Sequence, residues 1–260
     1  MKISILGAGA FGKALGKILT DNQHQISYYD PFVYPEVTLE AATFEADAVV
    51  IAIPSNFLAD FVADYPERLK KLPTVMASKG LLNLDLFADF FQLSVLSGPS
   101  FASELMEGKP ATLTASAPFA MGLFQNHQIS IELCEDALGI VLCGALKNIY
   151  AIGAGYHSDS HDSFAIFIQN AHLETKHYLE NHGAQPETAE LACGLGDLIL
   201  TCTSNNSRNY TCGVRLREGK HKSEIIEELH TVEGLSALEH VDFKSYPLLG
   251  QIDQLVNPHF

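Results

Sequence analysis

The sequence predicts an α/β protein in two parts: a doubly wound, mostly parallel sheet over residues 1–135 and an all-α domain over residues 136–260. Three observations support this prediction. Short β-branched runs alternate with helical stretches in the first half, which is typical of βαβ units. Apolar residues recur at helical spacing in the second half. A glycine-rich segment joins the first expected strand to the first expected helix.

The first half contains a series of runs of strand length. The run at 48–53 (AVVIAI) is fully apolar and is followed by Pro54, as expected of a buried parallel strand. Helical spacing is found at 11–20 and at 84–91. The expected strands are residues 2–6, 25–29, 48–53, 74–78, 93–97, 111–116 and 129–134.

The pattern changes near residue 136, after which few β-rich runs remain. The stretch 137–155 reads as one long, nearly apolar helix. Further helices are expected at 164–181, 186–193, 213–217 and 223–229. We therefore place the domain boundary near 135–137. Because the join is short, a cleft between the two domains is the expected ligand site.

The charge balance excludes several classes of partner. The chain has a formal net charge of -15 and a sequence pI of about 5.0. No basic stripe is visible, so nucleic-acid binding is not expected, and the acidic balance argues against an anionic membrane surface. The sequence shows no signal-peptide pattern at its start and no run of about 18 apolar residues, so membrane insertion is not expected either. Any phosphate-bearing ligand needs a local cluster of donors.

The cysteine pattern indicates reduced, mostly buried thiols in a cytoplasmic protein, because the number is odd and no CxxC motif occurs. A zinc site is the alternative for the last three, but their spacing matches no common zinc pattern, and no metal is expected. The five are Cys134, Cys143, Cys193, Cys202 and Cys212.

The segment from Gly7 to Gly12 reads GxGxxG, between an expected strand and an expected helix. In a Rossmann-like sheet, Gly7 allows the tight turn, Gly9 lets the backbone approach a pyrophosphate, and Gly12 lets helix and strand pack closely. The pyrophosphate then lies at the helix N-terminus, where backbone N–H groups favour an anion. The alternative is that these glycines are ordinary turn residues.

Asp30 lies at the end of the second expected strand, eighteen residues after Gly12. An acidic residue at this place accepts a hydrogen bond from the ribose 2′-OH of NAD. The same carboxylate repels the 2′-phosphate of NADP, so NAD is the first choice of cofactor and NADP the alternative. Asp30 can also be read as a helix cap.

Lys147 stands in the stretch GALKNIYAIGAG, inside an expected helix with almost no other charge. Burial disfavours the charged form of a lysine, which suits a group that gives and takes a proton near neutral pH. The alternative is a lysine whose stem lies in the core while its amine reaches the surface. Asp197 follows two nearby glycines and either pairs with Lys147 or caps the next helix.

Two further segments carry polar groups suited to a ligand. Arg208 and Asn209 offer a guanidinium fork and an amide, which suit a phosphate, although SNNSRN can also be a plain surface loop. The segment SGPSF at 97–101 is a strand end followed by a helix start. Backbone N–H groups and the Ser100 hydroxyl there can hold a polar ligand.

Taken together, these segments resemble the bacterial-type NAD(P)-dependent glycerol-3-phosphate dehydrogenases. The resemblance runs from Lys2 to about Leu255 and rests on GAGAFGKAL, SKGL, SGPSFA-x-E, KNIYAIGAG, GLGDLILTCTSNNSRN and VEG, in that order. It implies a Rossmann domain over 1–135 and a helical substrate domain over 136–260. It also implies the interconversion of dihydroxyacetone phosphate and sn-glycerol 3-phosphate with NAD(P)H, for glycerophospholipid synthesis in the cytoplasm.

The resemblance also assigns roles by motif position. Lys147 is implied to donate a proton to the substrate carbonyl oxygen as hydride arrives, and Lys79 to add positive charge near the substrate. The implied substrate contacts are Lys79, Gly98, Ser100, Asp197, Ser207, Arg208 and Asn209. The implied cofactor contacts are Gly7, Gly9, Ala10, Phe11, Gly12, Asp30, Lys79, Ala102, Arg208, Thr231 and Glu233.

The chain departs from this pattern in several places. The segment 30–47 is abbreviated, and the sequence stops soon after YPLLGQIDQLV, so terminal helical material is expected to be missing. A family helix that carries T-R-G-L reads FIQNA here, at 167–171. The preceding loop contains His157 and His161, and we expect a hydrophilic loop there rather than a metal site.

Two other classes of function remain open at this point. One is a dehydrogenase of the β-hydroxyacid type, although Ser207-Arg208-Asn209 favours a phosphate-bearing substrate. The other is a non-catalytic dinucleotide-binding protein, although a scaffold without activity has no need of Lys147 and Asp197 together. A homodimer is expected, because it is the common assembly of soluble enzymes.

Overall fold

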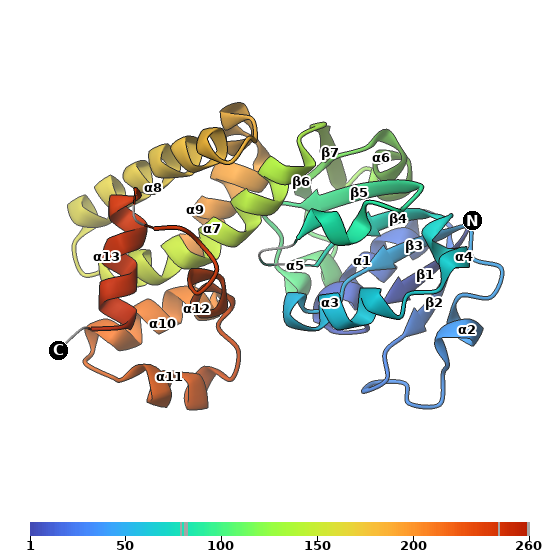
Figure 1. The fold of residues 1–260 in the computed structure, drawn as a ribbon, viewed down its shortest axis with the longest axis horizontal. Helices are drawn as coiled ribbons and strands as arrows, with labels where there is room; N and C mark the ends of the chain where they lie inside the picture. The colour runs from blue at the N-terminus through green and yellow to red at the C-terminus, as the bar shows by residue number, and fades with distance from the viewer. Residues whose placement is uncertain (79, 81–82, 244, 259–260) are drawn as a thin grey trace. The chain divides into compact units, whose positions relative to one another are not determined.

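The computed structural model describes residues 1–78, 80, 83–243 and 245–258. Contacts between Cα atoms divide the chain into two compact units, Met1–Ala137 and Leu138–Phe260. The first unit contains the sheet and the second is helical (Figure 1). The predicted α/β class, with helical material after the sheet, is therefore confirmed.

The strands of the first unit form one sheet in the order β2-β1-β3-β4-β5-β6-β7. Neighbouring strands are parallel except β5 and β6, so the prediction of a mostly parallel sheet is confirmed. The strands are β1 (Lys2–Leu6), β2 (Gln25–Tyr29), β3 (Ala48–Ile51), β4 (Pro73–Met76), β5 (Gln92–Ser97), β6 (Ala111–Ala115) and β7 (Ile129–Leu133). The helices between them are α1 (Ala10–Asp21), α2 (Leu39–Ala42), α3 (Ser55–Ala63), α4 (Glu67–Lys70), the 3₁₀ helix η1 (Leu84–Phe87), α5 (Ala102–Met106) and α6 (Pro118–Phe124).

Strand β1 lies between β2 and β3, so the chain leaves β1 toward one side and returns on the other. Leu6 pairs with Ile51 where these two strands end. Open α/β sheets bind ligands at such a switch point, beyond the carboxyl ends of the strands. The glycine-rich segment directly follows β1 at this place.

The sheet is buried in the way that its sequence predicts. Every residue of β3 is fully buried, as expected for the apolar run that contains it. On one face, Ile3, Ile5 and Val50 join an apolar cluster with Leu15 of α1 and Leu105 of α5. Because α1 packs into this cluster, its N-terminus is held at the end of β1.

Polar contacts hold the abbreviated segment between β2 and β3 against the sheet. The hydroxyls of Ser4 and Ser27 both donate hydrogen bonds to the carbonyl oxygen of Ala42, at 2.7 and 2.5 Å. Arg68 of α4 donates to the Thr43 hydroxyl oxygen at 2.7 Å. The short segment is therefore fixed although it contains only the four residues of α2 as helix.

The second unit is built around a long helix, α7 (Ala137–Tyr156), sixteen of whose residues are buried. By length and by its mean hydropathy of 1.6 this helix qualifies as a membrane span, but 83% of that stretch is buried inside the protein, as in the core helix of a globular domain. The elements around it are α8 (His161–Asn181), the 3₁₀ helix η2 (Pro186–Glu190), the π-helix η3 (Ala192–Gly196), α9 (Asp197–Thr203), α10 (Arg208–Arg217), α11 (Lys222–Leu229), α12 (Glu233–Leu238) and α13 (Pro247–Val256).

Glycines allow α7 and α10 to approach closely. A Cβ atom on Gly155 would overlap the carbonyl oxygen of Tyr210, and one on Gly213 would overlap that of Ile152. The glycines on both helices therefore fix how α10 crosses α7. Asn209, in the first turn of α10, is positioned by this crossing.

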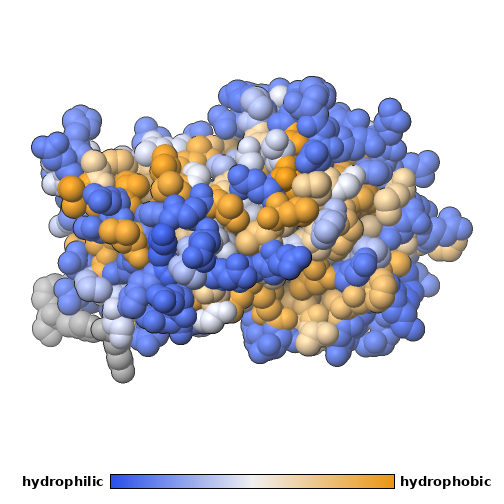
Figure 2. Space-filling view, turned by 90° about the horizontal axis from the view of Figure 1, so that it is seen from above, coloured by the Kyte–Doolittle hydropathy of each residue, from blue (hydrophilic) through white to orange (hydrophobic). Residues whose placement is uncertain are grey.

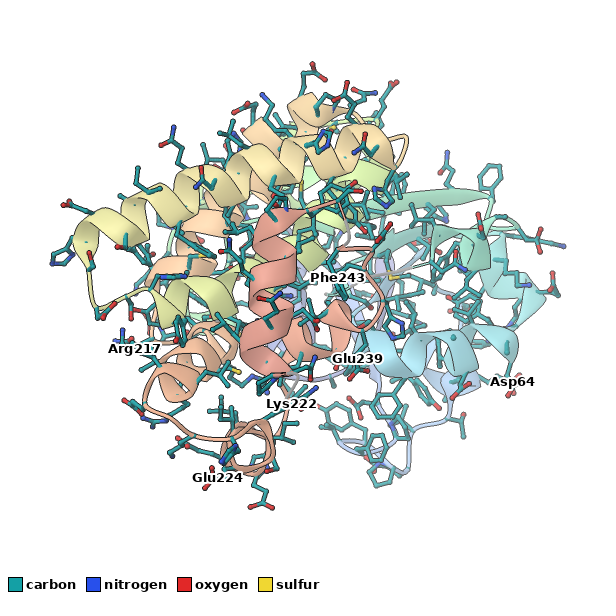
Figure 3. The ribbon with its side chains drawn as sticks, turned by 60° about the vertical axis from the view of Figure 1, so that its left-hand side comes forward. Asp64, Arg217, Lys222, Glu224, Glu239 and Phe243 are labelled. Carbon is teal, nitrogen blue, oxygen red and sulfur yellow. The ribbon has the colours of Figure 1, made fainter. Side chains whose placement is uncertain are left out.

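Side-chain contacts hold the last helices of the second unit. Glu174 of α8 accepts hydrogen bonds from two backbone N–H groups at the start of α13, at 2.8 and 2.9 Å. Lys222, labelled in Figure 3, donates to the Asn257 side-chain oxygen at 3.2 Å and lies 3.9 Å from Glu239. These contacts connect α8, α11 and the residues on either side of α13.

Three expected helices differ in the structure. The helix at 84–91 is only the four-residue η1, because the Asn83 side chain accepts the Asp85 N–H and starts a tight turn. The helix expected at 186–193 is instead two elements: the tightly wound 3₁₀ helix η2, which begins at Pro186, and the more widely wound π-helix, which begins after Leu191. The helix at 213–217 begins earlier, at Arg208, because the Ser207 hydroxyl caps it.

Candidate active site

The glycine-rich turn, residues 7–12, needs glycine for reasons visible in the backbone. Gly7 has a φ of 104°, and a Cβ there would lie 2.5 Å from the Ala52 carbonyl oxygen. The Gly7 N–H donates to the Tyr29 carbonyl oxygen at 2.8 Å. A Cβ on Gly12 would overlap the Gly7 carbonyl oxygen. Gly7 and Gly12 therefore let the end of β1, the end of β3 and the start of α1 meet.

Gly9 differs from these two glycines. It is exposed, and a Cβ placed on it would meet nothing within 4 Å. It is also the N-cap of α1, where no side chain makes a capping hydrogen bond, and Ala10 and Phe11 form the first helical turn. Open space beside a helix N-terminus without a side-chain cap suits a phosphate group. This part of the structure therefore fits the pyrophosphate of a dinucleotide.

Asp30 is brought next to the glycine-rich turn. One carboxylate oxygen accepts the Ala8 N–H at 2.8 Å, and the other accepts the N–H groups of Phe32 and Val33 at 3.0 and 3.2 Å. A carboxylate has about four acceptor positions, so capacity remains for a ligand hydroxyl. Asp30 thus shapes the turn and presents an acceptor beside it.

The SGPSF segment is also tightly constrained. Gly98 has a φ of 149°, and a Cβ there would lie 3.0 Å from Leu113 Cα. Ser100 is 6% exposed, and its hydroxyl donates to the Gly98 carbonyl oxygen at 3.1 Å. Phe101 caps α5, which begins at Ala102. The Ser100 hydroxyl proton is therefore engaged within the segment.

Lys79 lies outside the described residues, but its described neighbours are close to β3. The Ser78 hydroxyl lies 3.5 Å from the Ile51 carbonyl oxygen. A Cβ on Gly80 would lie 2.5 Å from the Ser55 hydroxyl oxygen, and Gly80 has a φ of 117°. The residues on each side of Lys79 therefore lie near the carboxyl end of this strand.

In the second unit, Lys147 and Asp197 form a buried ion pair. The Lys147 Nζ lies 2.5 Å from an Asp197 carboxylate oxygen, and the two side chains are 6% and 3% exposed. The alternative of a lysine that reaches the surface is therefore wrong. Asp197 is also the first residue of α9, so the residue that pairs with Lys147 also begins a helix.

Thr201 is a third member of this group. Its hydroxyl oxygen lies 3.4 Å from the Lys147 Nζ, 2.6 Å from the Asp197 carbonyl oxygen and 3.3 Å from its carboxylate. Thr201 follows Asp197 by one helical turn, which brings both to the same face of α9. Cys202 is buried beside this group, and the loss of solvent raises the pKa of its thiol far above the usual range. The lysine thus stands in a dry environment with one compensating charge.

A second polar group, which we call the asparagine network, adjoins the first through Asn148. Its amide donates to a Glu233 carboxylate oxygen at 3.1 Å. The Asn209 amide donates to the Asn148 side-chain oxygen at 2.9 Å, and its own oxygen accepts the Gly234 N–H at 2.8 Å. The network connects α7, α10 and the start of α12, and therefore fixes Asn209 beside the lysine helix.

Asn148 and Thr201 were not identified from the sequence. A signal for Asn148 exists, since it is the polar residue that follows Lys147 in an otherwise apolar stretch. Thr201 has a weaker signal, the spacing of four residues after Asp197. Neither signal predicts that α7 and α9 meet, because that contact depends on tertiary packing.

The remaining candidate residues of the second unit lie at helix starts. Ser207 is buried and caps α10, and Arg208 is the exposed first residue of that helix. Thr231 is exposed and follows His230, whose φ of 61° is uncommon for a non-glycine residue. Glu233 begins α12. Arg208 therefore presents a solvent-facing cation next to Asn209 in sequence.

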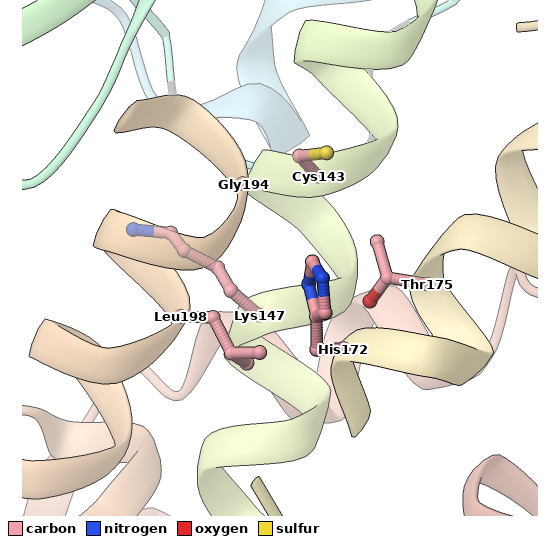
Figure 4. Close-up of a pocket in the computed structure, with 6 residues that line it drawn as sticks. All are labelled: Cys143, Lys147, His172, Thr175, Gly194 and Leu198. Atoms are coloured by element: carbon pink, nitrogen blue, oxygen red, sulfur yellow. The ribbon is translucent and has the colours of Figure 1, made fainter. Parts of the chain in front are cut away.

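A small pocket lies beside the stem of Lys147 (Figure 4). His172 and Thr175 of α8 form one side of it, and the π-helix and α9 contribute to the other. Its lining residues are Cys143, Lys147, His172, Thr175, Gly194 and Leu198. Over the described part of the chain, no group of three or more His, Cys, Asp or Glu is placed to hold a metal ion.

This arrangement can carry out proton transfer. A lysine ammonium beside a carboxylate in a dry site can protonate an oxygen that gains negative charge. The Asn209 amide and the Arg208 guanidinium supply hydrogen-bond donors that suit a phosphate. The glycine-rich turn and Asp30 suit a dinucleotide. The two units therefore contain the groups that a nicotinamide-dependent reduction needs: a proton donor, donors suited to a phosphate, and a turn suited to a dinucleotide.

Comparisons with known proteins agree with this chemistry. Residues 30–121 match the model of the NAD-dependent glycerol-3-phosphate dehydrogenase N-terminus, and residues 136–256 match that of its C-terminus. A glycerol-3-phosphate dehydrogenase [NAD(P)+] of Listeria monocytogenes is 32% identical, with 92% of this chain and 85% of the relative covered. One of Acholeplasma laidlawii is 29% identical, with 92% and 86% covered.

Solved structures show the same fold. The glycerol-3-phosphate dehydrogenase of Coxiella burnetii superposes with a TM-score of 0.86 at 24% identity, over 98% of this chain and 94% of that one. The enzyme of Saccharomyces cerevisiae gives a TM-score of 0.82 at 19% identity, over 100% and 96%. The two family matches and the Listeria relative show family membership as well as a shared fold. This chain therefore belongs to the NAD-dependent glycerol-3-phosphate dehydrogenase family.

Proposed function

We propose that this protein interconverts dihydroxyacetone phosphate and sn-glycerol 3-phosphate with NAD(P)H. The observation that carries the proposal is the Lys147–Asp197 pair, buried at 6% and 3% exposure next to the asparagine network. A bare dinucleotide-binding scaffold has no need of this arrangement, because a buried ion pair contributes little net stability. Family membership supports the same reaction.

In this proposal, Lys147 donates a proton to the ketone oxygen and takes it back in the reverse direction. Asp197 pairs with the amine in a buried site, and the Thr201 hydroxyl, 3.4 Å from Nζ, helps to orient it. A bound nicotinamide supplies the hydride. No metal is required, because the ammonium itself neutralises the charge that develops on the oxygen.

The substrate phosphate is held in the second unit. Arg208 provides an exposed guanidinium, and Asn209 provides an amide fixed by Asn148 and Gly234. Binding energy from the phosphate, which does not react, orients the carbonyl for transfer. Ser207, Gly98, Ser100 and Lys79 are the further proposed substrate contacts.

We infer that residues 1–135 bind the dinucleotide and that residues 136–260 carry the substrate and the catalytic lysine. Asp30 favours NAD, because its carboxylate stands where a 2′-phosphate would add a second negative charge. The proposed cofactor contacts are Gly7, Gly9, Ala10, Phe11, Gly12, Asp30, Lys79, Ala102, Arg208, Thr231 and Glu233.

We also infer a cytoplasmic enzyme, and a homodimer as its assembly. The described cysteines form no disulfide, as suits a reducing compartment. On the face shown in Figure 2, hydrophilic side chains predominate and hydrophobic ones gather in several patches between them. The molar mass in solution, measured by light scattering, tests the dimer.

The function is tested by following NADH absorbance with dihydroxyacetone phosphate. Wild type is expected to oxidise NADH, and Lys147→Met to lose about 10²- to 10⁴-fold in kcat, as when a general acid is removed. Lys220→Met is the matched control, because Lys220 is an exposed lysine of the same unit that pairs with Glu228. Wild type that binds NADH and leaves this ketone unreduced would refute the proposal.

A parallel run with NADPH tests the cofactor preference. NADH is expected to give the higher kcat/KM, and Asp30→Ser to narrow the difference. An equal rate with both cofactors in wild type would contradict the role given to Asp30.

A further inference from the structure

His172 is a titratable residue of α8 that the proposed reaction does not use. Its side chain is 16% exposed, and its Nε2 lies 3.2 Å from a carboxylate oxygen of Glu190. It also lines the small pocket together with Lys147, Gly194 and Leu198. In Figure 4 the imidazole and the lysine stem line this pocket, while the Lys147 amine extends away from the imidazole. His172 therefore lies beside the aliphatic stem of Lys147 and not beside its amine.

Glu190 connects His172 to the segment that carries Asp197. Glu190 is the last residue of η2, and the π-helix Ala192–Gly196 leads directly into α9 at Asp197. These two turns pack as one body. A Cβ on Gly194 would overlap the Ala189 carbonyl oxygen, and the Gly194 N–H donates to the Leu191 carbonyl oxygen at 3.0 Å. We therefore expect a displacement of Glu190 to reach Asp197 through this packed segment.

We propose that His172 is a positioning residue for the reaction: through Glu190 it fixes the π-helical turn that places Asp197 against Lys147. The proposal rests on the proposed function for its kinetic consequence only. Its structural part, the dependence of the ion pair on His172, stands by itself. π-Helical turns are concentrated at functional sites, and this one carries the charge partner of the buried amine.

Several charged groups face Glu190 and Lys147. His172 can donate to Glu190 from Nε2, because an imidazole nitrogen that carries a proton is a hydrogen-bond donor. Lys176 of α8 also contacts Glu190, at 2.6 Å, and its hydrogen bond is the main cause that lowers the pKa of that carboxyl, to which His172 adds. The Lys147 amine pairs with Asp197 and lies near Cys202, both of α9. The stem of Lys147 lines the pocket together with Cys143 of its own helix and His172 of α8.

The main variant is His172→Leu, which keeps the volume in the pocket and removes the hydrogen bond. A misplaced partner of a catalytic group lowers the rate, and we expect kcat to fall about tenfold while the KM for NADH stays unchanged. His172→Gln keeps a donor for Glu190 and is expected to stay within about twofold of wild type.

Two further variants separate positioning from general stability. Glu190→Ala should reproduce the fall in kcat of His172→Leu, and the double variant should add little, because both act through one contact. Lys176→Gln is the matched control, since it removes the other contact of Glu190 and leaves His172 in place. It is expected to leave kcat unchanged.

A crystal structure of His172→Leu provides a test that does not depend on turnover. The proposal expects the Lys147 Nζ to lie farther from the Asp197 carboxylate than the 2.5 Å of the wild-type chain. An unchanged pair, or a Lys176→Gln effect equal to that of His172→Leu, would overturn it. If wild type does not reduce dihydroxyacetone phosphate, the proposed function fails, while this crystallographic result still decides whether His172 positions the pair.

Discussion

Replacement of Asp197 by leucine isolates the charge that compensates Lys147. The Thr201 hydroxyl keeps its hydrogen bond to the backbone carbonyl oxygen of residue 197 at 2.6 Å, so the variant chiefly removes the carboxylate. The lysine side chain, 6% exposed in the native pair, is then left with a buried charge and no counter-charge. Solvent screening, which weakens surface ion pairs, is nearly absent at this exposure.

The expected loss is about 3–5 kcal/mol in the free energy of unfolding near neutral pH, as when one partner of a buried pair is removed. Urea denaturation at pH 6 measures this loss.

The control is the double variant Asp197→Leu/Lys147→Met, in which both charges are replaced by apolar groups. It should recover to within about 2 kcal/mol of wild type, because apolar replacement of a whole buried pair is often neutral. A single variant as stable as wild type at pH 6, or a double variant less stable than the single one, would refute the reasoning.

Three more predictions concern the dinucleotide site and the thiols. Gly12→Ala should destabilise the protein by about 1–3 kcal/mol or more in urea denaturation, because its Cβ overlaps a backbone carbonyl oxygen. Gly9→Ala should unfold like wild type and bind NADH more weakly by calorimetry, and equal unfolding curves for the two variants would contradict this. Asp30→Ala should weaken NADH binding about tenfold or more, since it removes three hydrogen bonds that shape the turn, and unchanged affinity would count against it. Burial raises the pKa of the Cys212 thiol to about 12 and that of Cys202 higher still, so neither should react with iodoacetamide in the native protein at pH 9; mass spectrometry of the labelled chain checks this.

The sheet and the glycine-rich turn could be predicted because their causes are local. The apolar run that contains β3 is buried throughout, and GxGxxG lies between a strand and a helix as its mechanism requires. In each case the signal that predicts the feature lies in one short stretch of sequence.

The helical unit was harder to predict, because its geometry depends on contacts between distant residues. The asparagine network joins residues 61 and 85 positions apart, and nothing local says that Asn148 meets Asn209. The sequence predicts an ordinary helix over 186–193, because the π-helix depends on the packing of Gly194 against Ala189, which no local pattern shows. The sequence also does not decide whether Lys147 pairs with Asp197, because these residues lie on different helices.

The burial of α7 has a consequence for synthesis of the chain. Chains grow from the N-terminus, and early domains fold first. Residues 137–156 therefore emerge while α8, α9, α10 and α13, which cover them, have not yet been made. During that interval an apolar stretch with a mean hydropathy of 1.6 stands in water. The helical unit acquires its core late in translation, and until then this apolar helix is exposed in the nascent chain and open to chaperone binding.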